Sequence, residues 1–326
     1  MGHLATDGSA AWPGEGWRDE MTSWIDDRLA GAGILRHGDV TEVRTWGRSA
    51  LLTFETDRGR MWAKAVPEVF AHEVAVTELL ADIDPGIVPP VVASDRMLGR
   101  IITEHVEGLS LASIGDNRAV WAATLSRLAE VQRVLAAEHA ALTVAGVAAA
   151  PLGRLAGSLP GLLADDDLLM VERPGGLTSG EAAALRGRLP ELVEACLALA
   201  ASGVPDSLEH GDLAADEVIM GEMGPVFLDW SDGSITHPFL SAASLLRDGA
   251  GNGSVADDRA RAYLGPWLDA GLGLTDTAAR DALAIARTVL PVHVAALYVE
   301  RILPSFQART ELELVVPNAL RAILTG

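Results

Sequence analysis

The spacing of apolar residues changes character once along this chain, close to Gly108. Before that glycine, short runs rich in valine, isoleucine and aromatic residues are separated by turn sequences, a pattern typical of strands. Beyond it, apolar residues recur mainly at helical spacing. This order restricts the chain to a small sheet followed by a larger helical unit. We therefore predict an α+β fold with a first lobe over residues 1–105 and a mostly helical second lobe over residues 106–326.

The first lobe is predicted to hold an antiparallel sheet. Turn sequences at 45–49 and 56–59 join three successive strand-like runs closely enough for a meander. The expected strands are 40–45, 50–55, 61–66, 87–93 and 100–105. Amphipathic spacing also predicts a leading helix over 17–32 and a second helix over 67–82, which Pro67 opens.

The second lobe is predicted to be helical apart from one embedded hairpin. The expected helices are 117–139, 179–201 with a break at Pro190, 257–270, 278–302 and 310–324. Two strand-like runs, 218–220 and 226–230, flank a glycine-containing turn and predict the hairpin. The segment 151–180 is rich in Gly, Pro and Asp, so we expect a mobile insertion there.

The charge of the chain excludes some partners. The 45 acidic and 25 basic residues give a net charge of −20, which repels nucleic acids and anionic lipids. A surface of this sign either attracts a cationic substrate or simply keeps the protein in solution. No apolar run is long enough to span a membrane, and residues 1–16 lack the pattern of a secretory signal, so a cytoplasmic protein is expected. The one cysteine, Cys196, lies in an apolar run and is expected to be buried.

Lys64 is the only lysine among the 25 basic residues. Arginine does not replace lysine where a site needs a compact charge on a flexible stem. Lys64 lies on the third expected strand, and Glu73 follows nine residues later in the next expected helix. A carboxylate at that place can hold the ammonium so that it bridges phosphate oxygens. We therefore predict that Lys64 and Glu73 belong to a nucleotide site rather than to a solvated surface.

The turn at 45–49 precedes the strand of Lys64. Its backbone N–H groups, with Ser49 at its end, are placed to close over phosphates. The turn holds a single glycine, Gly47, so the pattern alone favours an ordinary surface hairpin turn. A turn that covers phosphates stays open as the alternative.

A second group of candidate residues surrounds the expected hairpin. His210, Gly211 and Asp212 precede it, and Asp229 and Trp230 close it. Because a hairpin folds back on itself, Asp212 and Asp229 are expected to reach one place. Phosphoryl transfer needs one carboxylate to accept the proton of the attacking hydroxyl and another to hold Mg²⁺ on the phosphates. We predict Asp212 for the first task and Asp229 for the second.

Together these motifs resemble those of the aminoglycoside phosphotransferase and choline kinase family, which shares the two-lobed protein-kinase-like fold. The resemblance runs from about residue 38 to the end of the sequence. It implies that a linker between the lobes, from Glu104 to Val106, contacts adenine through backbone groups. It also implies that Asp212 lies in the catalytic loop and that Asp229 is a metal ligand. The expected cofactors are ATP and Mg²⁺.

The chain departs from the family pattern in the catalytic loop, where the family's metal-binding asparagine falls on Glu217. Glutamate is an oxygen ligand for Mg²⁺, but it carries a full charge. Beside Asp212, Asp216 and Asp229 it crowds carboxylates around the phosphates. Nucleotide binding should then depend strictly on metal, or one of these acids should have a raised pKa.

Two functions are compatible with this sequence. The first is an ATP-dependent phosphotransferase that moves the γ-phosphate to a hydroxyl group of a small molecule, such as an amino sugar, an aminoglycoside-like antibiotic or another metabolite. The acidic charge favours a cationic acceptor, although neutral hydroxyl compounds fit nearly as well. The alternative, which Glu217 motivates, is a nucleotide-binding pseudokinase acting through a protein partner. The retained Lys64, Glu73, Asp212 and Asp229 favour the enzyme. No nucleic-acid or membrane partner is expected, and the oligomeric state is not predicted.

Overall fold

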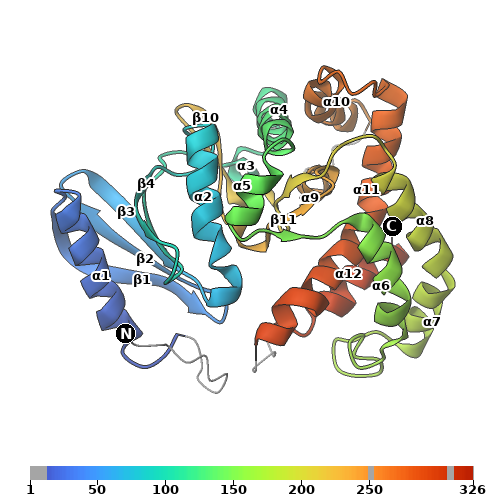
Figure 1. Ribbon diagram of the computed structural model, residues 1–326, viewed down its shortest axis with the longest axis horizontal. Coiled ribbons are helices and arrows are strands. Elements are labelled where there is room, and N and C mark those ends of the chain that lie inside the picture. Colours follow the sequence, from blue (N-terminus) through green and yellow to red (C-terminus); the bar gives the residue numbers. More distant parts are fainter. Residues whose placement is uncertain (1–12, 249–252, 307–311, 326) are drawn as a thin grey trace.

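Five antiparallel strands form a sheet in the amino-terminal part of the protein (Figure 1). The computed structural model describes residues 13–248, 253–306 and 312–325. The sheet has the order β1-β2-β3-β5-β4 and consists of β1 (Arg36–Trp46), β2 (Ser49–Thr56), β3 (Gly59–Ala65), β4 (Val91–Asp95) and β5 (Arg100–Glu104). The predicted meander of the first three strands is confirmed. Tight turns join them, because Trp46 pairs with Ser49 and Thr56 pairs with Gly59.

Helix α1 (Trp17–Gly31) covers one face of this sheet, as Figure 1 shows near the amino terminus. Alternate residues of β2, among them Leu52 and Phe54, point to the covered face. The side of α1 that carries Met21 and Ile25 packs against them. The buried residues of this cluster are Met21, Trp24, Ile25, Leu29, Ile34, Leu52, Phe54, Met61, Ala63, Ala65 and Ile102. A closely packed core therefore supports the sheet from this side.

Helix α2 (His72–Ile83) lies between the sheet and the helical lobe (Figure 1). A short 3₁₀ helix, Glu68–Phe70, precedes it, so the helix predicted from Pro67 begins later, at His72. Buried side chains of α2, including Val76 and Leu80, belong to the core of the helical lobe. Because this core crosses the proposed boundary between the lobes, the division at residue 105 stays a prediction.

The fourth strand begins later than predicted, at Val91 instead of Ile87. Ile87 and Val88 are buried in the core of the helical lobe. The carbonyl of Ile87 accepts a hydrogen bond of 2.8 Å from the backbone N–H of Phe227. Two prolines then follow, and proline has no N–H for a strand ladder.

The helical lobe contains the predicted hairpin. Its helices are α3 (Leu111–Ile114), α4 (Arg118–Leu135), α5 (His139–Val144), α6 (Leu152–Ala164), α7 (Ser179–Gly187), α8 (Leu189–Ala200), α9 (Phe239–Asp248), α10 (Ser254–Leu268), α11 (Asp276–Leu297) and α12 (Val315–Thr325). The hairpin consists of β9 (Val218–Gly221) and β10 (Gly224–Phe227), and β6 (Leu109–Ser110) adds a third strand beside β9. A second short sheet has the order β7-β11-β8, with β7 (Ala148–Ala149), β8 (Ser207–Glu209) and β11 (Ser234–Thr236).

The prediction of a mobile insertion at 151–180 was wrong for its first half. That half forms α6, which packs against α8. Leu155, Leu159 and Leu162 are buried on one face of α6. They recur at helical spacing, which the interleaved glycines and Pro160 obscured.

The two long helical runs predicted from the sequence are present with shifted ends. The 117–139 run forms α4, which ends at Leu135, and α5 begins at His139. The 179–201 run, predicted to break at Pro190, forms the two helices α7 and α8. Pro190 lies in the first turn of α8, where its missing N–H costs no helical hydrogen bond. The helix predicted over 310–324 begins at Val315, and residues 310 and 311 lie outside the described residues.

Helix α11 runs through the helical lobe and continues into a π-helical turn, Tyr298–Ile302. Within the described residues, Asp276–Ser305 is the one helical stretch long and apolar enough to cross a membrane. However, 61% of its apolar window is buried inside the protein. The helix contacts α8, α9 and α12, so core packing accounts for its apolar character.

Candidate active site

Lys64 lies at the centre of an ion-pair group that joins three elements. It belongs to β3, where it pairs across the sheet with Ile101. Its Nζ lies 2.6 Å from Oε1 of Glu73 on α2 and 2.9 Å from Oδ1 of Asp229, which follows β10. Only 17% of the Lys64 side chain is exposed. The structure therefore brings together the strand lysine, the helix glutamate and the hairpin aspartate.

Burial and proximity set the charges of this group. Burial disfavours the charged form of Lys64, but Asp229 and Glu73 outweigh it and hold the pKa of the ammonium above its usual range. Burial also opposes ionisation of Asp229, yet Lys64 outweighs it and lowers the pKa of that carboxyl below its usual range. In Glu73, burial prevails over Lys64 and raises the pKa to about 7. Asp229 is thus the firmly ionised partner of Lys64.

Asp229 has a left-handed backbone conformation, with φ 56° and ψ 67°. For a residue other than glycine this conformation costs roughly 1–2 kcal/mol. Asp229 lies two residues after the end of β10 and caps the 3₁₀ turn η3 (Trp230–Asp232). The hydroxyl of Ser231 donates a hydrogen bond of 2.7 Å to Oδ1 of Asp229. Such strain persists where surrounding contacts maintain it, and it is concentrated at active sites.

His210 fastens the candidate catalytic loop, residues 210–217, to the hairpin. Its Nε2 donates to the carbonyl of Leu228 at 2.8 Å, directly before Asp229. Its backbone N–H donates to the hydroxyl of Ser241 at 2.9 Å. The side chain is fully buried. The predicted loop and the predicted metal ligand are therefore held in a fixed relation.

Gly211 lets the loop approach η3 closely. Its φ is +88°, and a Cβ at this position would lie 2.5 Å from both Cβ and the carbonyl oxygen of Asp232. Asp212 follows, with a side chain that solvent still reaches. Partial burial and the charge of Asp232 raise the pKa of Asp212, against smaller opposing effects of His210 and Arg48. A raised pKa makes Asp212 a stronger proton acceptor.

Glu217 ends the 3₁₀ turn η2 (Ala215–Glu217), immediately before β9. Its carbonyl accepts a hydrogen bond of 2.9 Å from the N–H of Leu228, which fixes it beside the strand that leads to Asp229. Burial, followed by the charges of Asp229 and Asp216, raises the pKa of Glu217 to about 7. The crowding of acids predicted from the sequence is therefore present, and it contributes to the raised pKa of Glu217.

The other predicted nucleotide residues lie at the edges of the site. The hydroxyl of Ser49 accepts a hydrogen bond of 3.0 Å from Nε1 of Trp46, so it closes its own turn. Glu104 ends β5 with an exposed side chain. Val106 lies in the following linker, where its Cγ1 would be 3.2 Å from a Cβ placed at Gly221 of the hairpin. Their contacts with a nucleotide stay predictions.

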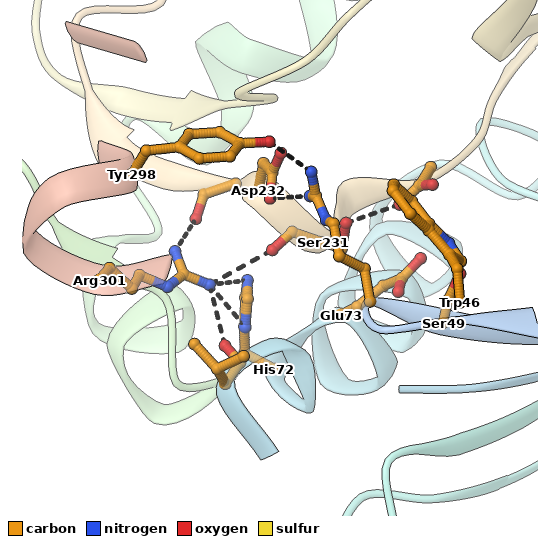
Figure 2. Close-up of polar contacts among 12 residues, drawn as sticks. Trp46, Ser49, His72, Glu73, Ser231, Asp232, Tyr298 and Arg301 are labelled. Carbon is orange, nitrogen blue, oxygen red and sulfur yellow. Dashed lines mark hydrogen bonds and ion pairs between the residues drawn. The ribbon is translucent and has the colours of Figure 1, made fainter. Parts of the chain in front are cut away.

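Arg301, which was not predicted from the sequence, ties the segment around η3 to the start of α2. It lies in the π-helical turn and donates to the carbonyls of Ser231 and Gly233 at 3.3 and 3.1 Å (Figure 2). Its Nη2 also lies 3.3 Å from the carbonyl of Val69 and 2.9 Å from Nε2 of His72. Burial and the charge of Arg301 lower the pKa of His72 to about 3, so this histidine is neutral. The helix that carries Glu73 is thereby anchored to the segment that carries Asp229.

Arg48 is the second residue of the site that the sequence did not reveal. It lies in the β1–β2 turn, and its guanidinium donates to Oδ1 of Asp232 and to the hydroxyl of Tyr298. Asp232 and Tyr298 lie beside each other in Figure 2. The turn itself was a candidate, but 250 residues separate Arg48 from Tyr298, and no local pattern indicates such a contact.

This chain resembles a known protein family and several solved structures over most of its length. The profile of the phosphotransferase enzyme family (APH) matches residues 20–279. Choline kinase LicA from Streptococcus pneumoniae is similar in structure, with a TM-score of 0.59 and 14% identity over 94% of this chain and 100% of that one. Its complex with AMP gives a TM-score of 0.55 and 13% identity over 93% and 98% of the two chains.

Macrolide 2'-phosphotransferase type I is similar too, with a TM-score of 0.60 and 18% identity over 93% of this chain and 96% of that one. A comparison with curated protein sequences found no match. At these identities the solved structures show the fold, which is the protein-kinase-like fold predicted from the sequence. Because the family profile spans most of the chain, the protein belongs to the phosphotransferase enzyme family and is a kinase with an alcohol group as acceptor.

Proposed function

We propose that this protein transfers the γ-phosphate of ATP to a hydroxyl group of a small molecule. The observation that carries the proposal is the contact of one ammonium, that of Lys64, with Glu73 at 2.6 Å and with Asp229 at 2.9 Å. A point charge held in this way suits phosphate oxygens. The similar choline kinase and macrolide phosphotransferase support a small-molecule acceptor, and the AMP complex of that choline kinase supports an adenine nucleotide.

Asp212 is the proposed base. The acceptor oxygen attacks the γ-phosphorus as its proton passes to Asp212, and the bond from that phosphorus to the bridging oxygen of ADP breaks. Lys64 holds the phosphates and offsets the charge that develops on ADP. His210 and Gly211 contribute by fixing the loop on which Asp212 lies.

Mg²⁺ fits the donor set that the site offers. Asp229 and Glu217 supply carboxylate oxygens, and the raised pKa of Glu217, about 7, marks an acid that a nearby cation would stabilise in its charged form. In the part of the chain that the structure describes, no group of three or more His, Cys, Asp or Glu residues is arranged to hold a metal. Phosphate oxygens and water would complete the coordination, as is usual for Mg²⁺. Bound there, the ion would neutralise phosphate charge.

The remaining assignments follow the family resemblance. Backbone groups from Glu104 to Val106 are proposed to contact adenine, and the turn at Ser49 is proposed to cover the phosphates. The net charge of −20 favours a cationic acceptor, such as an amino sugar or an aminoglycoside-like compound. We propose a cytoplasmic enzyme that acts without a nucleic-acid or membrane partner.

Thermal melts test the nucleotide site first. The purified protein is melted with and without ATP, in Mg²⁺, Mn²⁺ or EDTA. A ligand at about 100 times its Kd stabilises a protein by about 2.7 kcal/mol, which is visible as a rise in Tm. We expect this rise with ATP and metal, and little or none in EDTA. No rise under any condition would contradict a nucleotide site of this kind.

An acceptor panel then tests the transfer. ADP release is followed with amino sugars, aminoglycosides and neutral hydroxyl compounds, and product phosphorylation is confirmed by mass spectrometry. Asp212→Asn should bind ATP as the wild type does but should lose turnover by at least about 100-fold. Turnover with neutral acceptors alone would remove the cationic preference. Metal-dependent ATP binding without turnover on any acceptor would instead favour the pseudokinase.

A further inference from the structure

Arg48 connects the β1–β2 turn to the opposite side of the active site. Its Nη2 donates to Oδ1 of Asp232 and its Nη1 donates to the hydroxyl of Tyr298. Asp232 lies in η3, three residues after Asp229, and Tyr298 opens the π-helical turn after α11. Only 11% of the Arg48 side chain is exposed. The tip of a hairpin in the first lobe therefore contacts two segments of the second, and π-helical turns of this kind are frequent at functional sites.

Aromatic rings also lie close to the guanidinium of Arg48. Its Cζ lies 4.8 Å from the ring centroid of Phe70 and 5.7 Å from that of Tyr298. The turn also rests on the second lobe, because a Cβ at Gly47 would lie 3.8 Å from the ring of Phe306. Aromatic faces restrict the plane of a guanidinium. Arg48 is thus held in position before any ligand binds.

The charge of Arg48 acts on the reacting part of the site. Burial disfavours its charged form, but Asp232 outweighs it, Tyr298 and Asp229 add to the effect, and the pKa of the guanidinium lies above its usual range. The same charge favours the ionised form of Asp212, against burial and Asp232. Arg48 therefore acts on both the proposed base and the proposed metal ligand, and the γ-phosphate must come between these two for transfer to occur.

Within the described residues, the hydrogen bonds of Arg48 use only part of its guanidinium. A guanidinium has five N–H groups, and Asp232 and Tyr298 need only two of them. Separating Arg48 from Asp232 would leave a carboxylate with a side-chain exposure of 2% unpaired, which is strongly unfavourable. Binding a further anion through the remaining N–H groups avoids that loss. The planar fork of arginine matches the geometry of a phosphate group.

We propose that Arg48 binds the terminal phosphate of the nucleotide, and that Asp232 and Tyr298 position its guanidinium for this contact. The inference rests on the proposed kinase function and adds to it a residue from the β1–β2 turn. During transfer the γ-phosphorus exchanges its bond to ADP for a bond to the acceptor oxygen, and Arg48 stabilises the charge on its other oxygens. Asp232 and Tyr298 act through Arg48 and are positioning residues.

Nucleotide affinities test this inference without a known acceptor. Titration calorimetry in Mg²⁺ compares the β,γ-imido analogue of ATP with AMP, which lacks the terminal phosphate. Arg48→Met should weaken binding of the analogue by roughly 10- to 100-fold, the range for a hydrogen bond to a charged group, and should leave AMP within about twofold of wild type. Arg48→Lys keeps the charge but loses the fork, so it should fall in between. Tyr298→Phe should weaken the analogue alone, by about 3- to 10-fold.

Arg44→Met is the matched control. Arg44 lies on the same hairpin, is exposed, and stacks on Trp46 at 4.2 Å. Removing its charge should change the affinity of neither nucleotide.

Four results would overturn the inference or separate it from the function on which it rests. Equal weakening of the analogue and AMP by Arg48→Met would make Arg48 a structural tie alone and refute the proposal. Wild-type affinity for the analogue in Arg48→Met would refute it as well. If Arg48→Met does not fold, as judged by its melt, wild-type affinity of both Arg48→Lys and Tyr298→Phe for the analogue would overturn it. If the wild type binds neither nucleotide with Mg²⁺ or Mn²⁺, the proposed function itself fails.

Discussion

Replacing Glu217 by glutamine (E217Q) tests the crowding of acids that surrounds the candidate metal site. The substitution keeps the shape of the side chain and removes its charge. Burial, with the charges of Asp229 and Asp216, raises the pKa of Glu217 from 4.5 to about 7. The ionised form is thus disfavoured in the folded protein, and glutamine avoids that penalty.

The pKa shift gives both the magnitude and the sign of the effect. A change from 4.5 to about 7 corresponds to about 3 kcal/mol. Because solvent reaches part of the side chain, screening should reduce this to about 1–2 kcal/mol. A pKa that is higher in the folded than in the unfolded state means that the folded state binds more protons between these values. The contribution of Glu217 to stability is therefore full below about pH 4.5 and is lost as the pH rises through 7.

Thermal melts in EDTA at pH 5 and pH 8 check this prediction. E217Q should melt close to the wild type at pH 5 and about 2–4 °C higher at pH 8, since 1 kcal/mol shifts Tm by about 2 °C in a chain of this size. E222Q is the control, because Glu222 lies exposed at the tip of the same β9–β10 hairpin. The difference in Tm between E222Q and the wild type should be the same at both pH values. A stabilisation of E217Q that is absent at pH 8, or equal at both pH values, would refute the reasoning.

Three further predictions concern other parts of the structure. Gly211→Ala should lower the free energy of unfolding in urea by about 2 kcal/mol or more, because its Cβ would lie 2.5 Å from Asp232; an unchanged midpoint would contradict the close approach. Lys64→Arg should raise the Kd for ATP at least about 10-fold in calorimetry, since the larger fork does not fit between its two carboxylates; wild-type affinity would show that any cation suffices. Cys196 is buried and its thiol has a pKa raised to about 11, so a thiol reagent at pH 8 should label it only after unfolding; rapid labelling of the native protein would argue against this burial.

Residues whose partners lie in neighbouring elements could be predicted from the sequence. Lys64 and Glu73 are nine residues apart on a strand and the helix that follows it. Asp229 could be placed near the candidate catalytic loop, because the second strand of a hairpin returns the chain to the place where the first strand begins. In each case local periodicity and turn chemistry fixed the geometry, and the packing of the sheet did not alter it.

Contacts between distant segments could not be predicted in this way. The sequence shows that Arg48 lies in a turn, but the position of Tyr298 depends on how α11 ends. The π-helical turn at that end follows from no spacing of apolar residues, so neither Tyr298 nor Arg301 was a candidate. Ile87 is an example from the fold. It was predicted to begin a strand, but its side chain is buried in the core of the helical lobe. Tertiary packing, which a single sequence does not display, decided these positions.

The pairing of the only lysine with two carboxylates has a practical consequence for labelling this protein. Apart from the α-amino group of the chain, Lys64 provides the one primary amine available to acylating reagents. Its raised pKa and its two ion pairs keep it protonated and unreactive in the free protein. If Lys64 binds the nucleotide phosphates as proposed, a nucleotide that carries an acyl phosphate would deliver its reactive carbon beside this amine. With the α-amino group blocked, the mass of the intact protein would then report occupancy of Lys64, without digestion or sequencing of peptides.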